Sequence, residues 1–161
     1  MNAEKMTQKA MEALEAAHAD AVRKGHPELT TLHLLQALLE QEHGLTGNLL
    51  GKMGKDPGIL QQAVSEELGK LPTFNGASGR VAASGGMNQV LVRSDDEAKQ
   101  LGDEYVSVEH LLLAILEEGK SGPAGRLLQE QSIRRKELLK TLEDVRGGQR
   151  VTNRNPEDTF E

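Results

Sequence analysis

The chain has 161 residues, enough for one domain with a hydrophobic core, and its 19 Lys and Arg against 25 Asp and Glu give a net charge of −6. This acidic balance argues against a general nucleic-acid binder, because contacts to phosphates need an excess of basic residues. There is no cysteine, which excludes disulfides, thiolate zinc sites and cysteine nucleophiles.

The apolar residues are of the kinds that favour helices. Hydrophobic residues make up 37% of the sequence but aromatic residues only 2%, so Leu, Ala, Val, Ile and Met form the core. Leu, Ala and Met are strong helix formers, and clusters of β-branched residues are scarce. We therefore expect an all-α domain.

Four helices are predicted in the first half of the chain. Residues 3–24 carry apolar side chains three and four positions apart, and Gly25 follows as a residue that tolerates the left-handed backbone of a helix end. Thr30 is the predicted N-cap of the second helix, and Asp56 followed by proline begins the fourth. The second, third and fourth helices are expected at 31–42, 46–53 and 57–69.

The second half is expected to hold four more helices. Residues 72–86 are rich in Gly, Ser and Ala without helical spacing, and predict a long connecting loop. After it, Ser107 and Ser132 are the predicted N-caps of the sixth and eighth helices. The polar residues 149–161 predict a flexible linker. The fifth to eighth helices are expected at 87–101, 108–118, 122–131 and 133–146.

The sequence repeats itself with an offset of 77 residues, as from His33 to His110. Residues 29–40 match residues 106–117, and the same offset pairs Gly25 with Gly102. Neither half alone buries much apolar surface. We predict one globular eight-helix domain over residues 1–148, in which two four-helix repeats, about 1–71 and 87–148, are related by a pseudo-twofold axis.

The tripeptide at 119–121, Gly-Lys-Ser, has the ending of a phosphate-binding P-loop. The leading glycine of that motif is replaced by Ala114, and the tripeptide ends a predicted helix instead of following a strand. We therefore interpret Lys120 as a cation at a helix end, where the helix dipole favours it.

His33 and His110 could form a functional pair, either as metal ligands or as phosphoacceptors of a histidine phosphotransfer bundle. Each follows a predicted N-cap, Thr30 or Ser107, by three residues, a position from which a side chain can bond back to the cap backbone. This structural interpretation is favoured. No other spacing indicates a catalytic, metal or cofactor site, so the sequence argues for binding and against catalysis.

The doubled helix start resembles the Clp N-terminal repeat domain. It reads Thr30-x-x-His-Leu-Leu in the first copy and Ser107-x-Glu-His-Leu-Leu-Leu-Ala in the second, where residues 102–106 (Gly-Asp-Glu-Tyr-Val) precede it. That domain leads the large Clp unfoldases and disaggregases. Residues 146–152 and 155–158 resemble the junction that leads into the first AAA+ module in the disaggregase branch. The resemblance covers essentially the whole chain.

The resemblance implies the N-terminal domain of a hexameric ATP-driven ring that works with the DnaK chaperone system. These residues would bind exposed segments of misfolded or aggregated polypeptides and deliver them to the ring pore. They would carry no cofactor, because ATP and Mg would bind in the rest of the parent protein. The alternative is an adaptor-docking domain, as in the ClpA and ClpC unfoldases.

The sequence also predicts the cellular location and the partners of the protein. No apolar run approaches the roughly 20 residues of a membrane-spanning helix, and the polar N-terminus predicts no signal peptide, so we expect a cytoplasmic protein. We expect the isolated domain to be a monomer and predict neither a nucleic-acid nor a membrane partner.

The resemblance also implies where clients bind, near the start of the first helix and the turn between the fifth and sixth. The matching client-binding positions are Thr7, Ser84, Asp103 and Glu109. Their structural alternatives are capping a helix and supporting the turn. Family members can carry leucines on the outer face of the fifth helix and at the start of the sixth. This chain has Arg93, Glu97 and His110 there, which predicts a more polar or differently placed groove.

Overall fold

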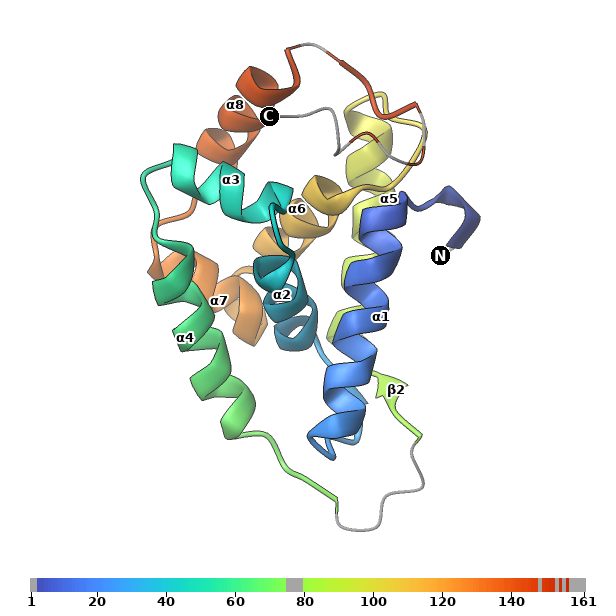
Figure 1. Ribbon diagram of the computed structural model, residues 1–161, viewed down its shortest axis with the longest axis vertical. Helices are drawn as coiled ribbons and strands as arrows, with labels where there is room; N and C mark the ends of the chain where they lie inside the picture. The colour runs from blue at the N-terminus through green and yellow to red at the C-terminus, as the bar shows by residue number, and fades with distance from the viewer. Residues whose placement is uncertain (1–2, 75–79, 148, 153, 155, 157–161) are drawn as a thin grey trace.

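The computed structural model describes residues 3–74, 80–147, 149–152, 154 and 156 (Figure 1). Within these ranges the chain forms eight α-helices, two short 3-10 helices and two very short strands, which confirms the predicted all-α fold. In chain order the elements are η1 (Ala3–Lys5), α1 (Gln8–Arg23), β1 (Glu28–Leu29), α2 (Thr31–Glu40), α3 (Leu45–Lys52), α4 (Pro57–Gly69), β2 (Ala82–Ala83), α5 (Gly85–Gln100), α6 (Val108–Glu118), η2 (Gly119–Ser121), α7 (Pro123–Glu130) and α8 (Arg135–Arg146).

The second helix of each repeat, α2 or α6, lies at the centre of the domain (Figure 1). Every residue of α6 from Val108 to Leu116 is buried, and eight of the ten residues of α2 are buried. A helix that is apolar around most of its circumference must be enclosed by other helices. Helix α1 covers α2 through the alanines at positions 10, 13, 17 and 21, whose small side chains let the two backbones approach closely.

The two repeats are interlocked by backbone pairing. Met6 forms a parallel bridge with Val106, and Leu29 pairs in parallel with Ala83. These two pairs are related by the 77-residue offset with the repeats exchanged. The amide of the following residue bonds identically in both, Thr7 N to the Val106 carbonyl and the amide of residue 84 to the Leu29 carbonyl, each at 2.9 Å. This equivalence confirms the pseudo-twofold arrangement, and each repeat depends on the other for these bonds.

The predicted helix ends are confirmed where a cap and a glycine both mark them. Asp56 caps α4 by accepting from the Gly58 amide at 2.8 Å. Gly25 and Gly102, which follow α1 and α5, have φ of +69° and +73°, a backbone conformation that glycine adopts without a Cβ clash. Thr30 and Ser107 are the N-caps of α2 and α6.

Other predicted ends were wrong. Helix α1 begins at Gln8 instead of residue 3, because the Thr7 hydroxyl accepts from the Ala10 amide at 3.2 Å and so caps the helix there. Helix α8 begins at Arg135 instead of residue 133. Ser132 has φ of +59°, outside the extended backbone of an N-cap, so the predicted cap is replaced by a left-handed turn.

The predicted long loop at 72–86 has ordered ends. The Phe74 amide donates to the Gly25 carbonyl at 2.8 Å, and β2 lies within the predicted loop. Helix α5 begins at Gly85, two residues earlier than predicted, with Ser84 as its N-cap. The centre of the loop, 75–79, lies outside the described residues. The sequence pattern missed β2 because its hydrogen-bond partner, β1, lies far away along the chain.

Candidate functional site

Both repeats start their central helix with the same histidine hydrogen bond. The Thr30 amide donates to His33 Nδ1 at 3.0 Å, and the Ser107 amide donates to His110 Nδ1 at 2.8 Å. Both histidines are buried. The geometry confirms their interpretation as helix-start residues. Because Nδ1 accepts, the ring proton of each neutral histidine lies on Nε2.

The Nε2 atom of each histidine contacts a residue seven positions earlier in the chain. His33 Nε2 lies 2.8 Å from His26 Nδ1, and His110 Nε2 lies 2.7 Å from Asp103 Oδ2. Positions 26 and 103 are related by the repeat offset. Burial, followed by the neighbouring His26, lowers the pKa of His33 to about 4, so the first pair is neutral at pH 7.

Asp103 is the centre of a buried polar network. Its carboxylate accepts hydrogen bonds from His110 Nε2, from the Arg146 guanidinium and from the Val151 amide. Burial alone would raise its pKa, but the hydrogen bonds from His110 and Arg146 outweigh burial and lower the pKa to about 2. One ionised side chain thus joins the α5–α6 turn to the end of α8 and to the segment that follows.

This network attaches the described start of the predicted linker to the domain. Val151 is completely buried, and its carbonyl accepts from the Glu104 amide at 2.8 Å. Further along, the Arg154 carbonyl accepts from the Gln8 amide at 2.8 Å. The start of α1, the α5–α6 turn, Val151 and Arg154 therefore meet in one region.

The four predicted client-binding residues fall in two places. Thr7 and Asp103 lie in the region just described, where the amide of Thr7 bonds to Val106. Glu109 is in the first turn of α6, and like Thr7 and Asp103 it is buried. Ser84 is partly exposed and occupies the position equivalent to Thr7 in the other repeat, where its hydroxyl caps α5 by accepting from the Met87 amide at 3.1 Å. Their contact with clients stays a prediction.

The polar residues at the expected apolar positions are all engaged within the domain. Arg93 forms an ion pair with Glu117, in which Nη1 lies 3.8 Å from Oε2. Glu97 is buried and accepts two hydrogen bonds from Arg135, at 2.6 and 2.7 Å. His110 is completely buried.

The exposed face of α5 nevertheless carries one apolar residue that sequence reasoning missed. Val92 has 62% of its surface exposed, in a shallow hollow of about 340 Å³ lined by Arg93 and three other polar residues of α5. The signal was the apolar run at 90–92, since Val90 fills the buried stripe of the helix and leaves residue 92 facing outward.

The described ranges hold neither a metal-binding cluster nor a membrane-spanning helix. No group of three or more His, Asp or Glu side chains is placed to hold a metal ion. No helix there has the length and apolar composition needed to cross a membrane.

These features define a helical domain made of two interlocked repeats, with its charged interior groups tied to helix starts and turns. Residues 5–131 match the Clp repeat N-terminal domain family, and the chain belongs to this family. The resemblance identified in the sequence is thereby confirmed.

Curated relatives match along the whole chain. It is 48% identical to the chaperone protein ClpB of Nitratidesulfovibrio vulgaris and 41% identical to that of Bacillus anthracis, and each alignment covers 100% of this chain and 19% of the relative. The chain therefore spans about a fifth of the length of these relatives. Both relatives are ClpB chaperones, the branch of the family whose junction residues 146–152 and 155–158 resemble.

Solved structures share the fold. The N-terminal domain of Hsp104 from Candida albicans superimposes with a TM-score of 0.83 at 24% identity, covering 95% of this chain and 99% of that one. A ClpV N-domain in complex with a VipB peptide superimposes with a TM-score of 0.68 at 21% identity, covering 90% and 89%.

Proposed function

We propose that this domain is the client-binding N-terminal domain of an ATP-dependent disaggregase. It contacts exposed segments of misfolded or aggregated polypeptides and delivers them to the pore of a hexameric ring that works with the DnaK system. The observation that carries the proposal is the match of the entire chain to ClpB chaperones at up to 48% identity. ATP and Mg bind elsewhere in the parent, and these residues perform no reaction.

The surface over α5 and the α5–α6 turn is the proposed contact region. Val92 offers an exposed apolar side chain among polar neighbours, and we assign it as the apolar contact for unfolded segments. Asp103, Glu109 and Thr7 are buried, so we assign them to holding this region in place. Ser84 is partly exposed, so we propose it as the one of the four that touches a client directly.

The test compares unfolded and folded proteins as ligands. A reduced and alkylated protein that cannot refold should bind the chain weakly, and the same protein in its folded form should not. Val92→Ser should weaken binding several-fold, whereas Ile59→Ser, which changes an exposed apolar residue of α4, should not. Equal binding of both forms contradicts client recognition. Tight binding of one folded partner with indifference to unfolded chains supports the adaptor-docking alternative.

A further inference from the structure

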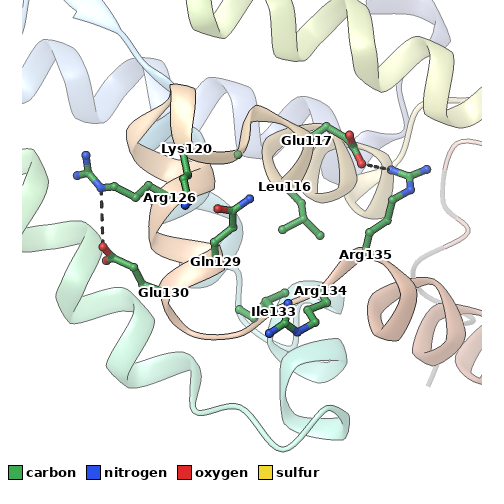
Figure 2. Close-up of a pocket in the computed structure, with 10 residues that line it drawn as sticks. Leu116, Glu117, Lys120, Arg126, Gln129, Glu130, Ile133, Arg134 and Arg135 are labelled. Atoms are coloured by element: carbon green, nitrogen blue, oxygen red, sulfur yellow. Dashed lines mark hydrogen bonds and ion pairs between the residues drawn. The ribbon is translucent and has the colours of Figure 1, made fainter.

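A second hollow, larger than the one around Val92, lies at the C-terminal end of α6. It has a volume of about 780 Å³ and lies between the end of α6, η2, α7 and the turn before α8 (Figure 2). Four cationic side chains line it against two carboxylates, those of Glu117 and Glu130, although the whole chain carries a charge of −6. We call this hollow the cationic cleft. Its four cations are Lys120, Arg126, Arg134 and Arg135.

Two of the four cations are fixed by carboxylates. Arg135 bonds to Glu97 and also to Glu117, the latter at 3.0 Å. Arg126 bonds to Glu67 of the first repeat at 3.0 Å, and its Nε lies 4.0 Å from Oε2 of Glu130 (Figure 2). These pairs neutralise both guanidinium groups and hold the walls of the cleft in place.

Lys120 and Arg134 are the two cations of the lining that no carboxylate of the described residues pairs with. Both side chains are exposed, and neither forms an ion pair within the part of the chain that the structure describes. In Figure 2 they lie on opposite sides of Gln129, which occupies the middle of the cleft. Two exposed cations with an amide between them are thus available to bind carboxylates of a partner, while Glu117 and Glu130 are occupied by the two arginines.

Two unusual turns place these cations. Gly119 has φ of +58°, which ends α6 and begins the η2 turn that carries Lys120. A Cβ at Gly119 would lie 3.3 Å from Gln129 Nε2, so glycine leaves room for the central amide. On the opposite side Ser132 has φ of +59°, and the chain then buries Ile133 and exposes Arg134.

We propose that the cationic cleft binds an acidic segment of a partner polypeptide. Carboxylates a few residues apart pair with Lys120 and Arg134, and the Gln129 amide donates to and accepts from the backbone between them. Leu116 and Ile133, the apolar residues of the lining, are almost fully buried, so the cleft offers no pocket for an apolar anchor. The net charge of −6 disfavours a long nucleic acid.

This binding is independent of client recognition through Val92, and a peptide without apolar residues separates the two. The probe is a short, fluorescently labelled peptide of alternating Glu and Ser, titrated with the 161-residue chain and followed by anisotropy. We expect saturable binding that weakens as salt is raised. Charge reversal at both free cations, Lys120→Glu with Arg134→Glu, should reduce affinity at least about tenfold. Val92→Ser should leave affinity unchanged.

The control reverses the same two residue types elsewhere. Lys52 and Arg80 are exposed, lack an ion pair among the described residues and lie outside the cleft, so Lys52→Glu with Arg80→Glu changes the net charge equally. It should alter affinity by no more than about twofold. A Lys120→Ala, Arg134→Ala variant repeats the test without added negative charge. An equal loss in the cleft and control variants, no binding of the peptide, or tighter binding of tripolyphosphate or of an oligonucleotide overturns the proposal.

Discussion

His33 donates a hydrogen bond to His26 across 2.8 Å, at the position where His110 in the second repeat donates to Asp103 across 2.7 Å. The first pair is two neutral rings, whereas the second contains an ionised carboxylate that also holds Arg146. The two repeats have kept one geometry while differing in charge. Of the two pairs, the one in the second repeat therefore also holds a residue that follows the last helix, since Asp103 accepts from the Val151 amide.

Acidification should destabilise the domain through the neutral pair first. In the unfolded chain His33 has its ordinary pKa of 6.5, whereas in the folded chain that pKa is about 4. Below pH 6.5 the unfolded state binds more protons, so stability is complete above that pH and falls as the pH drops toward 4. The loss approaches about 3 kcal/mol, at about 1.4 kcal/mol per pKa unit. Urea unfolding at a series of pH values measures it.

A histidine variant identifies the source of this pH dependence. His33→Gln should flatten the slope of unfolding free energy between pH 6.5 and 4.5, while His18→Gln, which changes an exposed histidine of α1, should leave the slope unchanged. If His33→Gln retains the slope of the unchanged chain, the neutral pair is not its cause.

Removing the charge of Asp103 should cost far more than removing a surface charge. Asp103→Asn removes the buried ion pair between Asp103 and Arg146 and should reduce the free energy of unfolding by about 3–5 kcal/mol. Asp95→Asn, which breaks an exposed pair with Lys99, should cost at most about 1 kcal/mol. Faster hydrogen exchange at the Val151 and Glu104 amides should accompany the first change. Unaltered exchange there argues against Asp103 as the anchor.

The same carboxylate gives a second acid transition. Since the pKa of Asp103 is about 2 in the folded domain against an ordinary 3.8, its contribution is complete above pH 3.8 and is lost as the pH falls toward 2. In Asp103→Asn this lower transition should disappear while the one near His33 remains. The pH series of urea unfolding described for His33 resolves both.

Gly122 should be intolerant of a side chain. A Cβ there would lie 1.9 Å from Glu118 Cδ, and Glu118 joins the repeats by accepting from Thr31 of the first repeat and from the Gly125 amide. Gly122→Ala should destabilise the domain by about 1–3 kcal/mol. Gly85→Ala has open space around the new methyl group and should be neutral or slightly stabilising. Equal melting temperatures of the two variants would contradict this account.

The elements that sequence predicts well are those fixed by neighbours along the chain. The helix-start role of His33 needs only Thr30 three residues earlier, and the 77-residue offset extends the same bond to His110. The turn at Ser132 could not be predicted, because serine is a common N-cap and the left-handed turn is decided by how Ile133 enters the core.

The features that sequence could not predict depend on distant contacts. Asp103 meets Arg146 across 43 positions and the Val151 amide across 48, and no local pattern links them. Which cations of the cationic cleft stay unpaired likewise depends on distant ion pairs. Arg126, for example, pairs with Glu67, 59 positions away along the chain. Sequence alone interpreted Lys120 as a cation at a helix end, and the folded chain brings it opposite Arg134.

We propose that the domain recognises clients through the outer surface of α5 and the turn that follows it. The most direct measurement is an NMR titration of the isotope-labelled chain with an unfolded protein, which reports on every backbone amide. We predict chemical-shift changes at residue 84 and over residues 88–96 and 101–106, with α4 unaffected. Changes concentrated on α4, or none at saturating ligand, would contradict it.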